Sequence, residues 1–192
     1  DTSAAAAAPG VLRVLTGADW DAEGYGGLPC EDLAKSRPDG SPIYQPHYPA
    51  LVSGQVKLVG DYVAFVVAET LAQARDAAEL IDVEYAPRQP VADIESAIAP
   101  GAPAVWPDCP DNISFTEEKG DAAAVAAAFE RADHIVRHKL VNNRVTAVAL
   151  EPRGCIGDYD KRQDRYTLYT GLQNPHPLRY QISRQVFDIP ET

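Results

Sequence analysis

Three polar residues toward the C-terminal end of the sequence stand at constrained backbone positions. Glu151 and Arg153 lie in "LEPRGCIGDYD", and Gln173 lies in "YTGLQNPHPLR", just before a predicted helix start. A carboxylate, a guanidinium and an amide can pair, bind an anion or donate hydrogen bonds. The residue types and spacing alone indicate a polar corner between residues 151 and 176 and leave its role open.

Histidines supply two further candidates. His176 falls in the first turn of the helix predicted after Gln173, where free N–H groups can hold an anion or an oxo group. An ordinary helix-start residue is the equal alternative. His134 and His138 lie four residues apart and can share one side of an element, but a metal site needs a third ligand, and none is adjacent. We therefore expect a solvated strand edge there.

Other kinds of chemistry lack their motifs. The sequence has no G-x-S-x-G elbow, no phosphate-binding loop and no dinucleotide fingerprint. Its 3 cysteines, Cys30, Cys109 and Cys155, are far apart and form no C-x-x-C pair, which argues against an iron–sulfur or zinc site in this chain. Cys155 lies in an apolar strand pattern, so we expect a buried, inert thiol.

The charge balance excludes some partners. With 17 basic and 28 acidic residues the net charge is −11, which argues against nucleic acid or an anionic membrane surface as partner. No apolar run approaches the roughly 20 residues that cross a bilayer, and "DTSAAAAAPG" lacks the basic start of a secretory signal. The expected location is the cytoplasm.

The first half of the sequence predicts a strand at residues 11–15 and an irregular excursion over residues 21–50. A β-branched apolar run at residues 62–68 predicts a strand buried on both faces. A helix follows, and residues 82–85 resume as a strand. The apolar stripe predicted to face the sheet recurs every three or four positions: Leu71, Ala74, Ala78 and Ile81.

A proline-rich link at residues 99–112 predicts a domain boundary, giving domains of residues 1–112 and 113–192. Asp121 is a suitable N-cap for a helix, and a polar hairpin turn separates two later strands. Asn174 and Pro175 begin a last helix that Pro190 ends. The predicted fold class is α+β. The strands predicted here are residues 134–149, 152–159 and 165–171, and the apolar faces of the two helices are Val125, Ala128, Phe129, Ala132 and Leu178, Ile182, Val186.

Five stretches, taken in order, resemble one family. They are "DTSAAAAAPGVLRVLTGADW", "VKLVGDYVAFVVAETLAQARDAAELIDVEYAPRQPVADIESAI", "PDNISFTEEKGDAAAVAAAFERADHIV", "LVNNRVTAVALEPRGCIGDYD" and "YTLYTGLQNPHPLR". Together they resemble the molybdopterin-binding large subunit of the xanthine dehydrogenase family, which includes aldehyde oxidases and aerobic carbon monoxide dehydrogenases. The resemblance implies an α/β hammerhead domain without its first strands, followed by the truncated opening of a mixed α/β molybdopterin-binding domain.

The resemblance also assigns roles to the polar corner. It implies that Gln173 approaches the molybdenum centre and hydrogen-bonds an oxo ligand without ligating the metal, with His176 as a further cofactor neighbour. Glu151 and Arg153 fit a scaffold role, as a buried charge pair that fixes the turn. Tyr62 departs from the proline that commonly follows the hammerhead turn at Gly60 and Asp61, so we expect a different turn geometry there. No catalytic residue and no metal ligand is assigned within this chain.

For the parent enzyme, the resemblance implies oxidation of carbon monoxide, an aldehyde or an N-heterocycle, with water as the oxygen source. The cofactor would be molybdenum on molybdopterin, in its cytosine dinucleotide form, with electrons passing to [2Fe–2S] clusters and FAD on partner subunits. The expected assembly joins the rest of the large subunit with iron–sulfur and FAD subunits as a dimer of heterotrimers. The pattern favours a bacterial carbon monoxide dehydrogenase-like enzyme, although aldehyde and heterocycle hydroxylases look similar here.

Three features of the family have no counterpart in the sequence: the later glycine-rich stretch, the substrate loop and the catalytic glutamate. We therefore expect a fragment that is inactive alone, in the cytoplasm or peripheral at the inner membrane face. The competing interpretation is a non-catalytic interaction or assembly module with a hammerhead fold.

Overall fold

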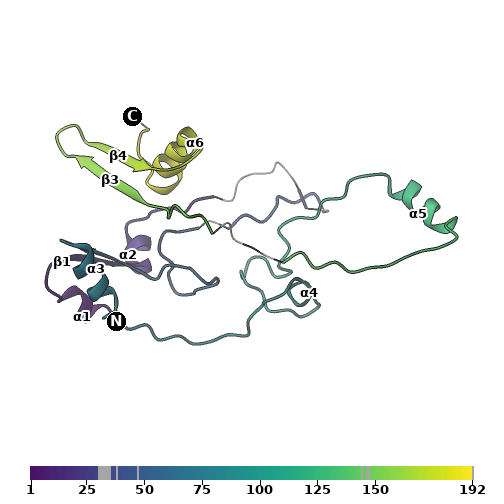
Figure 1. Ribbon diagram of the computed structural model, residues 1–192, viewed down its shortest axis with the longest axis horizontal. Helices are drawn as coiled ribbons and strands as arrows, with labels where there is room; N and C mark the ends of the chain where they lie inside the picture. Colours follow the sequence, from purple (N-terminus) through teal and green to yellow (C-terminus); the bar gives the residue numbers. More distant parts are fainter. Residues whose placement is uncertain (30–35, 38, 47, 144, 146–147, 192) are drawn as a thin grey trace. The chain divides into compact units, whose positions relative to one another are not determined.

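The computed structural model describes residues 1–29, 36–37, 39–46, 48–143, 145 and 148–191 (Figure 1). These residues form two compact units: unit 1 is Asp1–Thr116 with Asn174–Glu191, and unit 2 is Glu117–Gln173. Both units contain helices, and each contains a two-stranded antiparallel sheet. The predicted α+β class is confirmed.

The sheet of unit 1 joins strands from distant parts of the sequence. Strand β1 (Val11–Thr16) pairs antiparallel with β2 (Ala64–Ala68), with an irregularity between Val11 and Arg13. Helix α3 (Leu71–Ala78) packs on this sheet, and the short helix α1 (Ser3–Ala6) contacts both β1 and α3. The core here is made of small side chains, since Ala5 and Ala77 are completely buried. Figure 1 shows these elements gathered around the N-terminus.

Local signals explain where the helices of unit 1 begin. The capping box of α2 (Gly17–Ala22) joins Thr16 and Asp19: the Thr16 N–H donates to Asp19 Oδ2 at 2.7 Å, and the Asp19 N–H donates to Thr16 Oγ1 at 3.4 Å. Thr70 caps α3 through the Gln73 N–H, and Asp93 caps α4 (Ile94–Ala97) through the Ser96 N–H. Each cap satisfies an amide that would otherwise lack a helical partner.

Three expectations for this region are wrong. The strand at residues 62–68 is not buried on both faces, because in β2 the burial alternates and Phe65 is 58% exposed. The buried stripe of α3 centres on Ala77 and not on Ala78, and Leu71 is 67% exposed. Residues 82–85 form no strand, since no neighbouring strand pairs with them. The strand at residues 11–15 is confirmed.

Unit 2 contains a helix and a hairpin. Helix α5 (Ala122–Glu130) begins where predicted, with Asp121 accepting from the Ala124 N–H at 2.9 Å. Strands β3 (Cys155–Asp160) and β4 (Arg165–Thr170) pair in register across the predicted polar turn. The predicted apolar face of α5 is exposed at Val125 and Phe129.

Two further predictions for unit 2 are wrong. Where the structure describes residues 134–149, they form no strand, because no partner strand lies beside them. Cys155 is exposed rather than buried, since the hairpin is uncovered on the face that carries it. Cys30 and Arg144 lie outside the described residues.

The last helix begins as predicted, with Asn174 as N-cap and Pro175 in first position, although the Asn174 side chain makes no capping hydrogen bond. Helix α6 (Pro175–Tyr180) continues directly into the π-helix η1 (Gln181–Val186), which ends before Pro190 is reached. Val186 is buried, and the expected apolar stripe is confirmed in outline. Among the described residues, no helix combines the length and apolarity needed to cross a membrane.

Candidate functional site

Gln173 is the last residue of unit 2, joined by its peptide bond to Asn174, the first residue of the helical segment of unit 1. Its side chain is exposed, and its amide makes no hydrogen bond with any described residue. Pro175, two residues later, has a fixed φ and restricts the backbone of Asn174 between them. The structure therefore presents a free amide donor at the start of a rigid helical segment.

Glu151 and Arg153 are both exposed, and no ion pair joins them in the part of the chain that the structure describes. The expected buried charge pair is not formed within this chain and stays a prediction for the larger subunit. The physical reason is that no element of unit 2 covers the extended segment before β3. Exposed charges keep their hydration and need no partner.

The histidines are not brought together. His176 is exposed at the second position of α6, and His134 and His138 are exposed on irregular backbone of unit 2. Across residues 1–29, 36–37, 39–46, 48–143, 145 and 148–191, no group of three His, Cys, Asp or Glu side chains could hold a metal ion.

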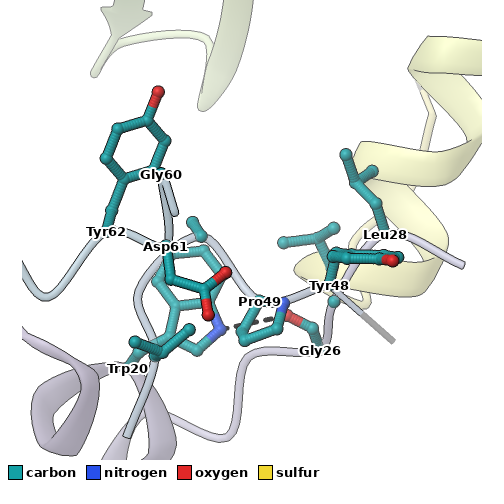
Figure 2. Close-up of a pocket in the computed structure, with 12 residues that line it drawn as sticks. Trp20, Gly26, Leu28, Tyr48, Pro49, Gly60, Asp61 and Tyr62 are labelled. Atoms are coloured by element: carbon teal, nitrogen blue, oxygen red, sulfur yellow. Dashed lines mark hydrogen bonds between the residues drawn. The ribbon is translucent and has the colours of Figure 1, made fainter. Parts of the chain in front are cut away.

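The structure has a cavity of about 310 Å³ in unit 1 that sequence reasoning missed (Figure 2). Its walls come from the irregular loops after α2, from the turn before β2 and from η1. The residues lining it are Trp20, Gly26, Gly27, Leu28, Tyr48, Pro49, Ala50, Val52, Gly60, Asp61, Tyr62 and Val186. The sequence feature that could have indicated this cavity is the aperiodic stretch over residues 21–50, in which glycine, proline and aromatic residues recur.

Two polar side chains that line this cavity, those of Asp61 and Trp20, are already engaged in hydrogen bonds. The Asp61 carboxylate accepts from the Lys57 N–H at 2.7 Å and from the Leu58 N–H at 3.0 Å, both through Oδ2. Trp20 Nε1 donates to the Gly26 carbonyl oxygen at 3.0 Å, the dashed line in Figure 2. These bonds shape the turn and the loop, so the cavity is a mainly apolar space beside η1.

A second polar cluster ties the segment around Tyr44 to the stretch before Ser114. The Tyr44 hydroxyl donates to Asp108 at 2.8 Å, and Ser114 Oγ donates to the Tyr44 carbonyl oxygen at 2.7 Å. The pKa of Tyr44 is raised to about 12. Partial burial is the larger cause, and the hydrogen bond to Asp108 is the next. These bonds join distant segments and therefore serve the fold.

Arg37, Asp111 and Cys109 complete this cluster. The Arg37 guanidinium forms an ion pair with Asp111. The pKa of the Asp111 carboxyl is lowered, mainly by the hydrogen bond from the Ile113 N–H and to a smaller extent by the charge of Arg37. Burial raises the pKa of the Cys109 thiol, which keeps it protonated and unreactive.

Comparison with known proteins decides the family. Residues 1–89 match the family model of the aldehyde oxidase and xanthine dehydrogenase a/b hammerhead domain, and residues 105–192 match that of the molybdopterin cofactor-binding domain. The chain belongs to the molybdenum hydroxylase large-subunit family. It comprises a hammerhead domain and the start of a molybdopterin-binding domain, as the ordered stretches predicted.

The relatives are bacterial enzymes. The chain is 34% identical over 184 residues to the nicotine 6-hydroxylase large subunit of Paenarthrobacter nicotinovorans, covering 95% of this chain and 21% of that protein. It is 30% identical over 212 residues to the carbon monoxide dehydrogenase large chain of Afipia carboxidovorans, covering 100% of this chain and 24% of that protein. The chain thus spans less than a third of the length of these relatives.

A solved structure agrees with the sequence matches. The crystal structure of quinoline 2-oxidoreductase from Pseudomonas putida 86 superposes with a TM-score of 0.81 at 29% identity, over 100% of this chain and 23% of that one. The fold and the order of the segments are therefore those of a molybdenum hydroxylase large subunit.

The exposed polar groups fit a molybdopterin cofactor. A metal carried by an organic cofactor needs hydrogen-bond donors from the protein more than it needs metal ligands. The Gln173 amide is such a donor, exposed and uncharged, within the stretch that matches the cofactor-binding domain.

Proposed function

We propose that this chain is part of the large subunit of a molybdenum hydroxylase that oxidises a small substrate with water as the oxygen source. The observation that carries the proposal is the consecutive match of a hammerhead model and a molybdopterin-binding model along one chain. We place the domain boundary near residue 112, at the end of the proline-rich link.

The overall reaction balances without molecular oxygen. For a C–H substrate, one water supplies the hydroxyl oxygen, and two protons and two electrons leave; for carbon monoxide, water and the substrate give carbon dioxide, two protons and two electrons. When bound, the molybdenum cofactor supplies the two-electron oxidation. The electrons then pass to [2Fe–2S] clusters and FAD on partner subunits, and we propose the cytosine dinucleotide form of the cofactor.

The contribution of this chain is orientation. Gln173 would donate a hydrogen bond to an oxo group of the cofactor, and a neutral amide does this without adding charge beside an oxidised metal. His176 is a second polar neighbour on the same turn. Glu151 and Arg153 would support the adjoining backbone once other parts of the subunit cover them.

The proposed substrate belongs to one of three classes: carbon monoxide, an aldehyde or an N-heterocycle. The relatives named above include a nicotine hydroxylase and a carbon monoxide dehydrogenase. The proposed assembly contains the rest of the large subunit, an iron–sulfur subunit and an FAD subunit, in the cytoplasm or at the inner membrane face. We propose that the chain alone is inactive.

A second candidate, a non-catalytic assembly module, is favoured by one observation. Unit 2 exposes large apolar side chains along its extended segment, among them Val136, which is 89% exposed, and Leu140, which is 83% exposed. Side chains of this kind mark surfaces that other protein covers. Catalysis and assembly predict different results in the intact complex.

The deciding experiment uses the complex purified from its source cells. Carbon monoxide, aldehydes and N-heterocycles are offered with an artificial electron acceptor in water labelled with oxygen-18. Catalysis by a molybdenum hydroxylase predicts label in the product of one substrate class. An oxidised product without label would contradict water as the oxygen source and therefore the molybdenum hydroxylase. An intact complex that oxidises none of the three classes would favour the assembly module.

The role of Gln173 is tested in the full-length subunit. Gln173→Ala should lower turnover about tenfold or more, because one lost transition-state hydrogen bond costs that much. Gln163→Ala, in the exposed hairpin turn, is the matched control and should turn over normally. Wild-type turnover in Gln173→Ala would contradict the role.

A further inference from the structure

The helical segment that follows Gln173 is attached to the hammerhead domain by its far end. The Gly26 N–H donates to the Val186 carbonyl oxygen at 2.8 Å. Val186 is the last residue of η1, and a carbonyl at a helix C-terminus has no partner within the helix. The loop after α2 therefore completes the end of the π-helix.

Three aromatic rings reinforce this attachment. Trp20 and Tyr25 pack edge to face with centroids 5.0 Å apart, and Tyr25 packs edge to face with Phe187 at 5.1 Å. Trp20 and Phe187 complete the triangle at 6.2 Å. Such pairs add stabilisation beyond the apolar area that they bury. The Trp20 ring also donates to the Gly26 carbonyl, so it braces the same loop.

The loop approaches η1 so closely that only glycine fits at the contact. A Cβ on Gly26 would lie 2.0 Å from the Gln185 carbonyl oxygen, a distance that no side chain tolerates. Substitution must therefore move the loop or move η1. The apolar cavity beside η1, lined by Trp20, Gly26 and Val186, gives the helix room to shift without unfolding (Figure 2).

A shift of η1 would be transmitted toward Gln173. Helix α6 passes into η1 without a break, and α6 begins at Pro175, one residue after Asn174. A continuous helix moves as a unit, so displacement at Val186 also displaces the residue bonded to Gln173. π-Helical turns occur often at functional sites, which fits a segment whose geometry matters beyond packing.

We propose that Gly26, Trp20 and Tyr25 of the hammerhead domain are positioning residues for Gln173, acting through η1 and α6. This inference rests on the proposed function. The hammerhead domain thereby holds the helical segment to which the residue carrying the amide donor is covalently joined. Misplacement of a positioned group by about 1 Å can cost on the order of a hundredfold in rate.

The test compares two glycines in the full-length enzyme. Gly26→Ala forces a clash with η1, whereas Gly10→Ala forces an equally close clash, 2.1 Å from Nε2 of Gln73 in α3, outside the cavity beside η1. Gly26→Ala should lower kcat about tenfold with KM almost unchanged, the signature of a lost transition-state interaction. It should also raise deuterium uptake in a peptide covering residues 174–187. Gly10→Ala, strained also by its φ of 77°, should lower the melting temperature but change neither kcat nor that uptake.

A double variant separates positioning from general damage. Gly26→Ala combined with Gln173→Ala should be no slower than Gln173→Ala alone, because both changes remove one interaction. If the kcat losses of the two single variants multiply in the double variant, the positioning role is overturned. Unchanged deuterium uptake at residues 174–187 in Gly26→Ala would overturn it too, and in both cases the proposed function still stands. A Gln173→Ala enzyme with normal turnover would overturn the role of Gln173 and the positioning inference with it.

If Gly26→Ala fails to fold, Phe187→Leu gives the same test with a milder change. It keeps an apolar side chain but removes the edge-to-face contact with Tyr25. We expect a kcat loss of about threefold, smaller than that of Gly26→Ala, because only one of the ring contacts that hold the loop against η1 is removed. Phe129→Leu, on the exposed face of α5, is its control. Equal kcat in these two variants would overturn the inference.

Discussion

Unit 1 is held by contacts between residues far apart in the sequence, whereas unit 2 is held by contacts between near neighbours. In unit 1, β1 pairs with β2 across a long excursion, and Tyr44 and Ser114 exchange hydrogen bonds. In unit 2, β3 and β4 are joined by one tight turn, and α5 touches little else. A single substitution should therefore matter more in unit 1.

The units also differ in what they bury. Both expose large apolar side chains, but the buried apolar residues that the structure describes all lie in unit 1: Ala5, Leu51, Ala77, Cys109 and Val186. In unit 1, polar side chains with several partners take the place of a large core. Substituting those side chains therefore tests most directly whether unit 1 depends on long-range contacts more than unit 2 does.

The largest effect is expected at Asn112. Its side chain donates to the carbonyl oxygens of Ala97 at 2.9 Å and Pro103 at 3.0 Å, and accepts from the Val105 N–H at 2.9 Å. Its φ is 55°, a left-handed conformation that asparagine tolerates better than alanine. Asn112→Ala should cost about 3 kcal/mol, roughly 1 kcal/mol for each hydrogen bond lost.

Native-state hydrogen exchange in the full-length subunit measures this cost, read in peptides that cover residues 94–113. Asn142→Ala, an exposed asparagine of unit 2, is the control and should change stability by less than about 0.5 kcal/mol. Similar losses in the two variants would remove the distinction between the units.

A smaller effect is expected at the helix caps. Thr70 caps α3, which packs on a sheet, and Asp121 caps α5, which is exposed around its circumference. Thr70→Ala should lower the stability of unit 1 by about 1 kcal/mol, the usual cost of a lost cap. Asp121→Ala should speed exchange only within residues 122–130. If exchange in unit 1 also rises in Asp121→Ala, the units are coupled more tightly than their contacts indicate.

The smallest effect is the response of Tyr44 to alkaline pH. Its pKa rises from 10.0 to about 12 in the folded chain. The folded state therefore keeps a proton that the unfolded state loses, so the stabilisation is fully present below pH 10 and is lost as the pH rises toward about 12. The melting-temperature difference between wild type and Tyr44→Phe should shrink over this window. A difference independent of pH would contradict the hydrogen bond to Asp108.

The comparison also explains which structural predictions succeeded. The helix starts at Asp121 and Pro175 and the turn between β3 and β4 depend on residues a few positions apart, and all were predictable. The strands predicted at residues 82–85 and 134–149 needed partners that sequence periodicity does not supply. Exposure of Phe65 and Cys155 could not be foreseen, since it depends on which sheet faces are covered.

For the site, the sequence could single out Gln173 because its neighbours constrain the backbone and the ordered motifs resemble a family. The contact between Gly26 and η1 could not be predicted. It joins residues from opposite ends of the chain, and a glycine in an aperiodic loop has no pattern that names its partner. Nor did any motif indicate the cluster of Arg37, Tyr44 and Asp111, whose members are brought together only by the fold.

The most direct measurement of the central claim is the molybdenum content of the intact complex purified from its source cells, determined by mass spectrometry of the metal. A large subunit of a molybdenum hydroxylase predicts molybdenum in an equimolar ratio to this polypeptide, retained through gel filtration. A folded, intact complex that contains no molybdenum, even after growth in molybdate, would contradict the account.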